Sequence, residues 1–182
     1  MPHPRRRAGP GVKAMTSAAL LADAFGRIQE AAHDVLEGMA VEDVLVRLDD
    51  DANPIAWLVW HLARVQDDHV AGVAGTDQVW TSAGWAGRFG LPLEDADIGY
   101  GHDTREVAGV RAAPELLLGY LDAVQDATLR FVATITDDDL ERVVDEHWDP
   151  PVTLGVRLVS VLADNLQHVG QAAYVKGILE RR

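Results

Sequence analysis

The segment from Ile55 to Val73, IAWLVWHLARVQDDHVAGV, constrains the fold more than any other part of the chain. Asn53 and Pro54 come directly before it and predict a helix start, with Asn53 as the N-cap and Pro54 in the first turn. The segment continues without a helix breaker to about Gly72, and apolar side chains lie on nearly every side of it. We therefore predict a helix that is deeply buried among other elements.

Three further segments carry apolar side chains at helical spacing, and each predicts one more long helix. They run from Ser17 to Met39, from Pro114 to Ile135, and from about Thr153 to Leu179. Their apolar stripes are Leu21, Phe25, Ile28, Ala32, Val35 and Met39; Leu117, Leu121, Val124, Thr128, Phe131 and Ile135; and Leu154, Leu158, Val161, Asn165, His168 and Ala172. The second of these stripes has no ionisable side chain, whereas polar residues enter the third.

Residues 74–113 separate the second and third predicted helices, and no helical periodicity continues through them. A connection of this length is expected to cross the bundle or to form part of a site. Its Trp80 and Trp85 are expected to pack over the open end of the bundle. The predicted fold class is all-α, a four-helix bundle with a long crossover between helices 2 and 3. Short helical turns are expected within residues 41–48 and, after a Thr136 cap, within residues 136–144.

The composition is that of a soluble globular protein, with 48% hydrophobic and 25% charged residues among 182. This length predicts a single domain over residues 15–182, preceded by a disordered basic tail at residues 1–14. The net charge of −13 argues against a nucleic-acid partner, because an acidic surface repels phosphates. No apolar run reaches the roughly 18 residues that span a bilayer, so we expect no membrane partner and a cytoplasmic protein.

The chain contains no cysteine, so a metal ion would have to be bound by His, Asp or Glu side chains. Asp164 and His168 are four residues apart on one predicted helix and therefore project from the same face. His61 interrupts the most apolar segment and needs a polar partner if it is buried. We predict that these three residues hold one divalent ion, with zinc as the expected metal and one position open for water or substrate.

A purely structural explanation of the same residues stays open. Asp164 could face solvent while His168 is a hydrogen-bonded core histidine, and His61 could be a neutral imidazole that donates to a backbone carbonyl or to Asp164. Gln171 lies one turn from His168 and is the candidate catalytic residue, because its amide could orient a ligand or substrate. It could equally be a helix-surface amide. Asn165 is expected to make an interhelical hydrogen bond.

The remaining polar and aromatic residues near these positions have other predicted roles. Asp68 and His69 lie two turns beyond His61, about 10 Å along the helix, and are expected at the mouth of the site. Trp57 and Trp60 flank His61 and are expected to pack in the core. Surface positions are expected for the other histidines, His3, His33, His102 and His147.

Two motifs carry a family resemblance. NPIAWLVWHL, with His61, and DNLQHVGQAAYVKG, with His168, Gly170 and Gln171, resemble the signature segments of the DinB-like family. The resemblance includes the DUF664 branch and the N-terminal domain of mycothiol-dependent maleylpyruvate isomerase, and it covers nearly the whole chain. It implies a four-helix bundle with a crossover after the second helix, and a metal held by one His of helix two and two ligands of helix four. The family's usual pattern has His or Glu where this chain has Asp164.

The resemblance also implies an activity, that of a metal-dependent enzyme similar to stand-alone mycothiol S-transferases. Such an enzyme activates a low-molecular-weight thiol, here expected to be mycothiol, for attack on an electrophilic small molecule. Metal coordination favours this chemistry because it lowers the pKa of the thiol. Maleylpyruvate isomerisation is less expected, because the second domain of the isomerases is not found in this chain.

Two other functions stay open. One is a non-catalytic protein whose helices serve dimerisation or a stress-response interaction. For the enzyme, too, the predicted assembly is a homodimer. The other is metal-assisted hydrolysis, for which Asp68 is a distant candidate for the general base.

Overall fold

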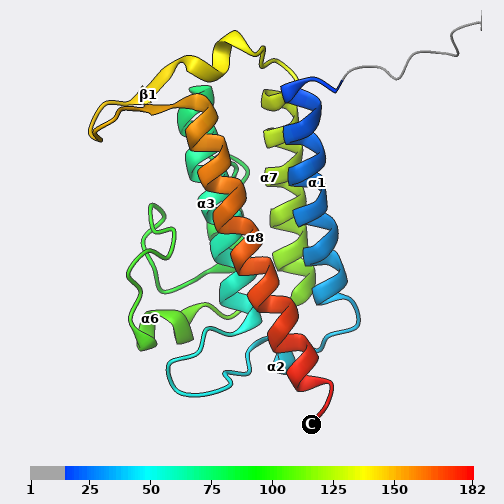
Figure 1. Ribbon diagram of the computed structural model, residues 1–182. Helices are drawn as coiled ribbons and strands as arrows, with labels where there is room; N and C mark the ends of the chain where they lie inside the picture. The colour runs from blue at the N-terminus through cyan, green and yellow to red at the C-terminus, as the bar shows by residue number, and fades with distance from the viewer. Residues whose placement is uncertain (1–14) are drawn as a thin grey trace, which may run out of the picture.

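The computed structural model describes residues 15–182 and shows four long helices side by side (Figure 1). They are α1 (Ser17–Leu36), α3 (Ile55–Ala74), α7 (Pro114–Val132) and α8 (Leu154–Leu179). α3 and α7 run in one direction, while α1 and α8 run in the other. The predicted all-α bundle with a long crossover between its second and third long helices is confirmed. The predicted basic tail lies outside the described residues.

The ends of the long helices follow from local capping. At the start of α1, the hydroxyl oxygen of Thr16 accepts the N–H of Ala19 at 3.1 Å. At α3 the predicted cap is wrong, because Pro54 itself is the N-cap and the side chain of Asn53 caps nothing. Pro54 has the extended conformation of a capping residue (φ −74°, ψ 161°), so the helix begins one residue later. Gly75 ends α3 at φ +69°, a conformation that favours glycine.

The crossover between α3 and α7 contains short helices, although no periodicity predicted them. Those in the crossover are α4 (Val79–Ser82), α5 (Trp85–Phe89) and α6 (Thr104–Gly109), and α2 (Val41–Val44) precedes α3. Trp80 is buried, with its ring centroid 5.0 Å from that of Tyr120 on α7 and 6.4 Å from that of Trp60 on α3. The crossover tryptophans therefore cover the flank formed by α3 and α7, and not an open end of the bundle as predicted.

A short helical turn and a small hairpin connect α7 to α8. The turn predicted within residues 136–144 is present as a 3-10 helix, η1 (Asp138–Glu141), and two antiparallel strands follow it, β1 (Val143–Asp145) and β2 (Val152–Thr153). Thr136 does not cap a helix as an acceptor, because its N–H and hydroxyl both donate to the carboxylate of Asp139, at 2.8 and 2.6 Å. Figure 1 shows the hairpin beside the first turns of α8.

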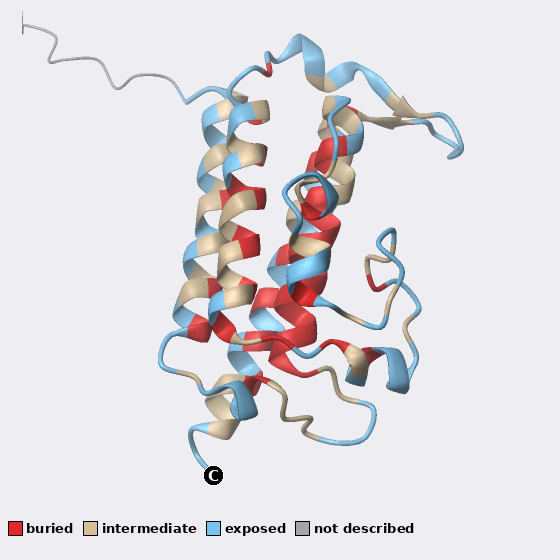
Figure 2. Cartoon of the chain, turned by 180° about the vertical axis from the view of Figure 1, so that it is seen from behind, coloured by how far each residue is buried: buried red, intermediate tan, exposed pale blue. Residues whose placement is uncertain are grey.

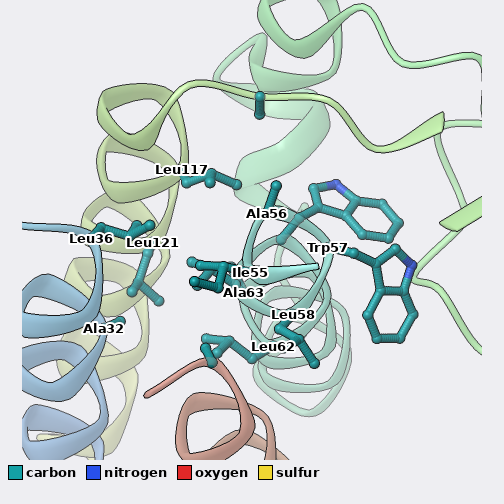
Figure 3. Close-up of a cluster of buried hydrophobic side chains, with 14 of the residues drawn as sticks. Ala32, Leu36, Ile55, Ala56, Trp57, Leu58, Leu62, Ala63, Leu117 and Leu121 are labelled. Atoms are coloured by element: carbon teal, nitrogen blue, oxygen red, sulfur yellow. The ribbon is translucent and has the colours of Figure 1, made fainter. Parts of the chain in front are cut away.

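The buried side chains lie on the inner faces of the helices and form two apolar clusters (Figure 2). One surrounds the first half of α3, where Ile55 and Leu62 lie near Leu121 of α7 (Figure 3). The other contains Phe25 of α1 and Val70 of α3. No helix within residues 15–182 is long and apolar enough to cross a membrane.

A layer of hydrogen-bonded polar residues crosses the bundle at Gln66, between the two clusters. The amide nitrogen of Gln66 donates to Gln125 at 3.1 Å and to Thr128 at 2.9 Å, both on α7. Its amide oxygen accepts from Asn165 of α8 at 2.8 Å, the interhelical bond expected for that residue. Because buried polar groups need partners, this layer fixes the relative heights of α3, α7 and α8.

Candidate metal centre

Three metal-ligating side chains meet between α3 and α8. His61 comes from α3, and Asp164 and His168 come from successive turns of α8. One possible ligand atom from each residue lies within 4.8 Å of the other two, and His61 Nε2 is 4.0 Å from Asp164 Oδ2. The structure therefore brings together the three residues predicted from the sequence as metal ligands.

The size of a zinc site limits how far apart the ligand atoms of His61, Asp164 and His168 can lie. Two atoms that bind one zinc ion, each at about 2.1 Å, can be at most about 4.2 Å apart. The pair formed by His61 Nε2 and Asp164 Oδ2 meets this limit. All three atoms lie within 4.8 Å of one another, about half an ångström beyond this limit, and rotation within one side-chain rotamer can supply such a movement.

Two buried atoms of this group have no hydrogen-bond partner in residues 15–182. They are Asp164 Oδ2 and His168 Nδ1. Leaving a buried polar atom without a partner costs about 1–3 kcal/mol, and a bound cation would remove that cost. Carboxylate oxygens and imidazole nitrogens are both ordinary zinc ligands. The residues present therefore fit a divalent metal ion.

The crossover orients His61 for metal binding. Its Nδ1 is hydrogen-bonded to the carbonyl oxygen of Ile98. Because a carbonyl can only accept, Nδ1 carries the proton of the neutral ring and the lone pair is on Nε2, which faces Asp164. A hydrogen bond from His61 to a backbone carbonyl is also what the explanation without a metal predicts. It is compatible with a metal, since a ligating histidine commonly donates its other N–H to such a group.

Burial keeps both histidines of the group neutral. It lowers the pKa of His61 to about 4, although the hydrogen bond to Ile98 acts in the opposite direction. Burial also lowers the pKa of His168, against the attraction of the Asp164 carboxylate. At neutral pH both rings therefore keep a free lone pair, which is the form that binds a metal.

Trp57 forms one wall of the centre. Its ring is stacked on His61, with 4.5 Å between centroids, and lies 6.0 Å from the ring of His168. The indole N–H donates to His102 Nδ1 at 3.0 Å, and His102 Nε2 donates to the carboxylate of Asp97 at 2.9 Å. The prediction of a surface position for His102 is wrong, since its side chain is only 3% exposed. Its burial is possible because both ring nitrogens have partners.

Gly99 lets the crossover approach His61 closely. It has φ +97°, and a Cβ there would lie 2.5 Å from His61 Nδ1 and 3.1 Å from the ring of Trp60. A side chain at this position would therefore have to displace the crossover. The next residue, Tyr100, is 60% exposed and packs edge-on against His61, with 5.4 Å between ring centroids. Sequence reasoning missed Gly99, and its only signal is the pair of glycines that flank Tyr100.

Arg64 ties the crossover to α3. Its side chain is fully buried, and its guanidinium donates to the carbonyl oxygens of Asp95 at 3.2 Å and Asp97 at 3.1 Å. It also donates to the amide oxygen of Gln78 at 2.9 Å. Because Asp97 directly precedes Ile98, these bonds position the carbonyl that orients His61.

Asp67 ties the first part of the crossover to α3, as a hydrogen-bond acceptor. Its carboxylate accepts the N–H groups of Val79 and Trp80, at 2.8 and 2.7 Å, and the hydroxyl of Tyr120 at 2.8 Å. The prediction that the inner face of α7 carries no ionisable side chain is therefore wrong for Tyr120. Burial raises the pKa of Tyr120 well above its usual value, so the hydroxyl stays protonated and donates.

Comparison with known proteins identifies the family. A family model described as the DinB superfamily matches residues 24–172. The chain belongs to the DinB superfamily. Its structure is similar to the crystal structure of a conserved protein from Enterococcus faecalis, with a TM-score of 0.86 and 32% sequence identity, over 93% of this chain and 100% of that chain. The comparison with curated proteins found no match.

Asp164 is the unusual residue of this DinB centre. Its side chain is shorter than the His or Glu that is usual in the family pattern. Its Oδ2 nevertheless lies 4.0 Å from His61 Nε2 and has no other partner in the described chain. The shorter side chain therefore still reaches the place where an ion would bind.

Other polar residues flank the centre without joining it. Gln171 is exposed and lies, with Gln167 and Leu58, along a hollow of about 630 Å³ beside the C-terminal half of α8. Asp68 and His69 pair with each other at 3.2 Å on the opposite side of the centre. Asp68 and His69 do not belong to the group of three possible ligands.

Proposed function

We propose that this DinB protein is a divalent-metal-dependent thiol S-transferase with zinc as its metal. It would activate a low-molecular-weight thiol, with mycothiol as the expected one, for attack on an electrophilic small molecule. The observation that carries the proposal is the group of His61, Asp164 and His168, which offers three ligands from two helices. Three protein ligands leave a coordination position for substrate, an arrangement typical of catalytic and not of structural sites.

The chemistry requires a thiolate. A bound divalent ion would lower the pKa of a coordinated thiol, so that the thiolate persists at neutral pH. The thiol loses its proton to solvent, its sulfur forms a bond to the electrophilic carbon, and the leaving group departs with the electron pair of the broken bond. On an activated double bond, protonation of the neighbouring carbon completes the addition. Because the chain has no cysteine, the sulfur comes from a co-substrate.

The residues around the centre have separate roles in this proposal. Ile98 holds His61 with Nε2 toward the ion. Trp57 covers the two imidazoles on one side and excludes water there. Gln171, one turn from His168 and on the hollow beside the C-terminal half of α8, would orient the electrophile through its amide group. Binding both substrates at one place supplies the proximity on which such a transfer depends.

Metal-assisted hydrolysis has less support. Its candidate general base, Asp68, accepts a hydrogen bond from Gln78 at 2.8 Å and pairs with His69. These partners lower the pKa of Asp68, the bond to His69 most strongly, which makes its carboxylate a weaker base.

Zinc titration of the purified protein tests the metal centre. We expect about one ion per chain at micromolar free zinc. His168→Ala should keep the circular dichroism spectrum of the wild type and lose the ion, because one of three ligands is gone. His147→Ala is the matched control, since that side chain is 95% exposed. A folded wild-type protein that binds no zinc would refute the enzymatic proposal and favour the non-catalytic alternative.

A thiol panel tests the reaction. Conjugation of a fluorogenic electrophile is measured with mycothiol, with glutathione and without thiol, for the zinc-loaded protein and the His168→Ala variant. We expect zinc-dependent conjugation that requires a thiol. Turnover of the electrophile without any thiol would contradict the transferase and indicate a hydrolase.

A further inference from the structure

Three side chains form a hydrogen-bonded series beside the metal centre. They are Trp57 of α3 and, from the crossover, His102 and Asp97. Because an indole N–H can only donate, Nδ1 of His102 accepts it, at 3.0 Å, and the proton of the ring is on Nε2. This Nε2–H donates to the carboxylate of Asp97, 2.9 Å from each oxygen. The series therefore fixes both the tautomer of His102 and the direction of the indole N–H.

Packing alone does not explain a histidine at position 102. The side chain of His102 is 3% exposed, and its ring is stacked on Trp60 with 5.8 Å between centroids. An apolar ring would fill the same space without the cost of burying polar nitrogens. His102 is also not one of the three candidate metal ligands. It provides a link of defined geometry between Trp57 and Asp97, whose Oδ1 also accepts the backbone N–H of Gly99 at 2.8 Å.

Two contacts of different direction fix the ring of His61. The hydrogen bond from its Nδ1 to the carbonyl oxygen of Ile98 acts at one edge of the ring. This bond alone leaves the ring free to tilt about the line from Nδ1 to the oxygen, because hydrogen bonds tolerate a broad range of angles at a carbonyl. The indole of Trp57 removes this freedom, since it is stacked on the ring with 4.5 Å between centroids and 13° between planes. The plane of Trp57 therefore determines where Nε2 of His61 points.

We propose that His102 and Asp97 are positioning residues of the metal centre, which act through Trp57 to hold the His61 ring in the orientation that binds the ion. The inference rests on the proposed function, because His61 has to be a metal ligand for its orientation to matter. Removal of a group that orients a ligating histidine commonly lowers metal affinity about 10–100-fold. Because Trp57 lies between His102 and the ligand, we expect an effect at the lower end of this range.

Two variants break the hydrogen bond between Trp57 and His102 from its two sides. His102→Gln keeps an N–H for Asp97 but has no acceptor at the place of Nδ1, and Trp57→Phe keeps a stacked ring without the indole N–H. We expect each variant to lower the affinity for zinc about tenfold, measured by competition with a chelating dye. The double variant should bind zinc no more weakly than either single variant, because both changes remove the same interaction.

Trp80→Phe and His147→Gln are the matched controls. Trp80 is likewise buried, at 4% exposure, but its indole N–H has no partner in residues 15–182. His147 also pairs with an aspartate, Asp145 at 3.0 Å, but its side chain is 95% exposed. Both controls should keep the wild-type affinity for zinc. Losses of affinity that add up in the double variant would overturn the inference. So would a His102→Gln variant that binds zinc as tightly as the wild type, whatever its stability in urea.

NMR spectra of the metal-free protein separate this inference from the proposed function. The stacked indole of Trp57 shifts the carbon-bound ring protons of His61 upfield, because they lie over the face of an aromatic ring. We expect this shift to shrink in His102→Gln and to persist in His147→Gln. Asp97→Asn, which leaves His102 in place, provides the same test if His102→Gln does not fold. An unchanged shift in the variant that folds would overturn the inference, whether or not the protein binds zinc. A reduced shift in a protein that binds no zinc would support the positioning of His61 and refute only the transferase.

Discussion

Asp164 and His168 each have a buried atom without a partner in the described chain, as do Trp60, Trp80, Gln125 and Asn165. Among these six residues, only Asp164 and His168 belong to the group that could hold a metal ion. Elsewhere in the same groove, Nδ1 of His61 and both ring nitrogens of His102 are hydrogen-bonded. Binding of an ion to the folded state would therefore also stabilise the fold, in proportion to the logarithm of the free metal concentration.

Asp164→Asn tests the negative charge at this position. We expect the affinity for zinc to fall at least about tenfold, because the variant keeps the shape of the side chain but loses the anionic ligand. Asp164→Glu, which restores the charge on a longer side chain, should retain binding. Competition with a chelating dye measures the affinities, and Asp126→Asn on exposed α7 is the control. Equal affinities for the Asn variant and the wild type would show that Asp164 is not a ligand.

Gly99→Ala and Gly101→Ala form a second matched pair. Both glycines have positive φ, +97° and +74°, so each alanine should destabilise the fold by about 1–2 kcal/mol. Only at Gly99 would the added Cβ also collide with His61, whereas at Gly101 it meets open space. We expect an additional loss of about 1–3 kcal/mol in Gly99→Ala, together with weaker zinc binding. Urea denaturation and zinc titration of both variants measure this, and equal behaviour would contradict the contact.

At the scale of secondary-structure elements, α3 serves as the support for the crossover. Its side chains Trp57, His61, Arg64 and Asp67 recur at steps of three and four, and each is hydrogen-bonded to the crossover. Ordering a loop as long as the crossover costs conformational entropy, and the hydrogen bonds from this row of four α3 side chains offset part of that cost. The same row places the crossover over the metal centre.

Arg64→Met tests this support. It should lower the free energy of unfolding by about 3–5 kcal/mol, because it leaves buried carbonyl oxygens and the Asp67 carboxylate without their cation. Tyr120→Phe removes one hydroxyl from the same network and should cost about 1–2 kcal/mol, so it preserves the test if Arg64→Met does not fold. Urea denaturation provides both values. Arg130→Met, on the exposed side of α7, should change stability by less than about 0.5 kcal/mol.

At the scale of the whole molecule, the outward side of α8 differs from the rest of an acidic protein. Its exposed positions carry no charged residue and are Val156, Val159, Ser160, Ala163, Leu166, Gln167, Gly170, Gln171, Ala173 and Tyr174. Four of these are large apolar side chains that are 53–68% exposed. Because copies with a charge of −13 repel each other, an uncharged face is where two copies can approach most easily. We propose that the predicted homodimer forms through the first half of this face, around Val156, Val159 and Ala163, which leaves the hollow beside Gln167 and Gln171 open.

Analytical ultracentrifugation tests the dimer. We expect dimers that become tighter at higher salt, because salt screens the repulsion between acidic copies. Val159→Glu should shift the protein to monomers, while Leu20→Glu, at a similarly exposed position of α1, should not. A monomeric wild type at high salt, or dimers that persist in Val159→Glu, would contradict this interface.

The four long helices, and the positions of the three candidate ligands along them, follow from the sequence alone. Apolar spacing is a local property, so Leu21 to Met39 or Leu154 to Ala172 predict a helix without knowledge of any partner. The four-residue step from Asp164 to His168 likewise places both on one face of any helix that contains them. The family motifs add His61, and they also show that Asp164 stands where His or Glu is usual.

The way in which the crossover meets the bundle depends on the tertiary fold. The burial of His102, the approach of Gly99 to His61, and the support from Arg64 all join residues that are distant in the sequence and follow no periodic pattern. The hairpin, which the sequence did not predict, brings Asp145 to Arg157. Such contacts depend on which faces of the helices remain open after the bundle has packed. Helical periodicity describes the faces of one helix at a time, so it could not predict which loop covers them.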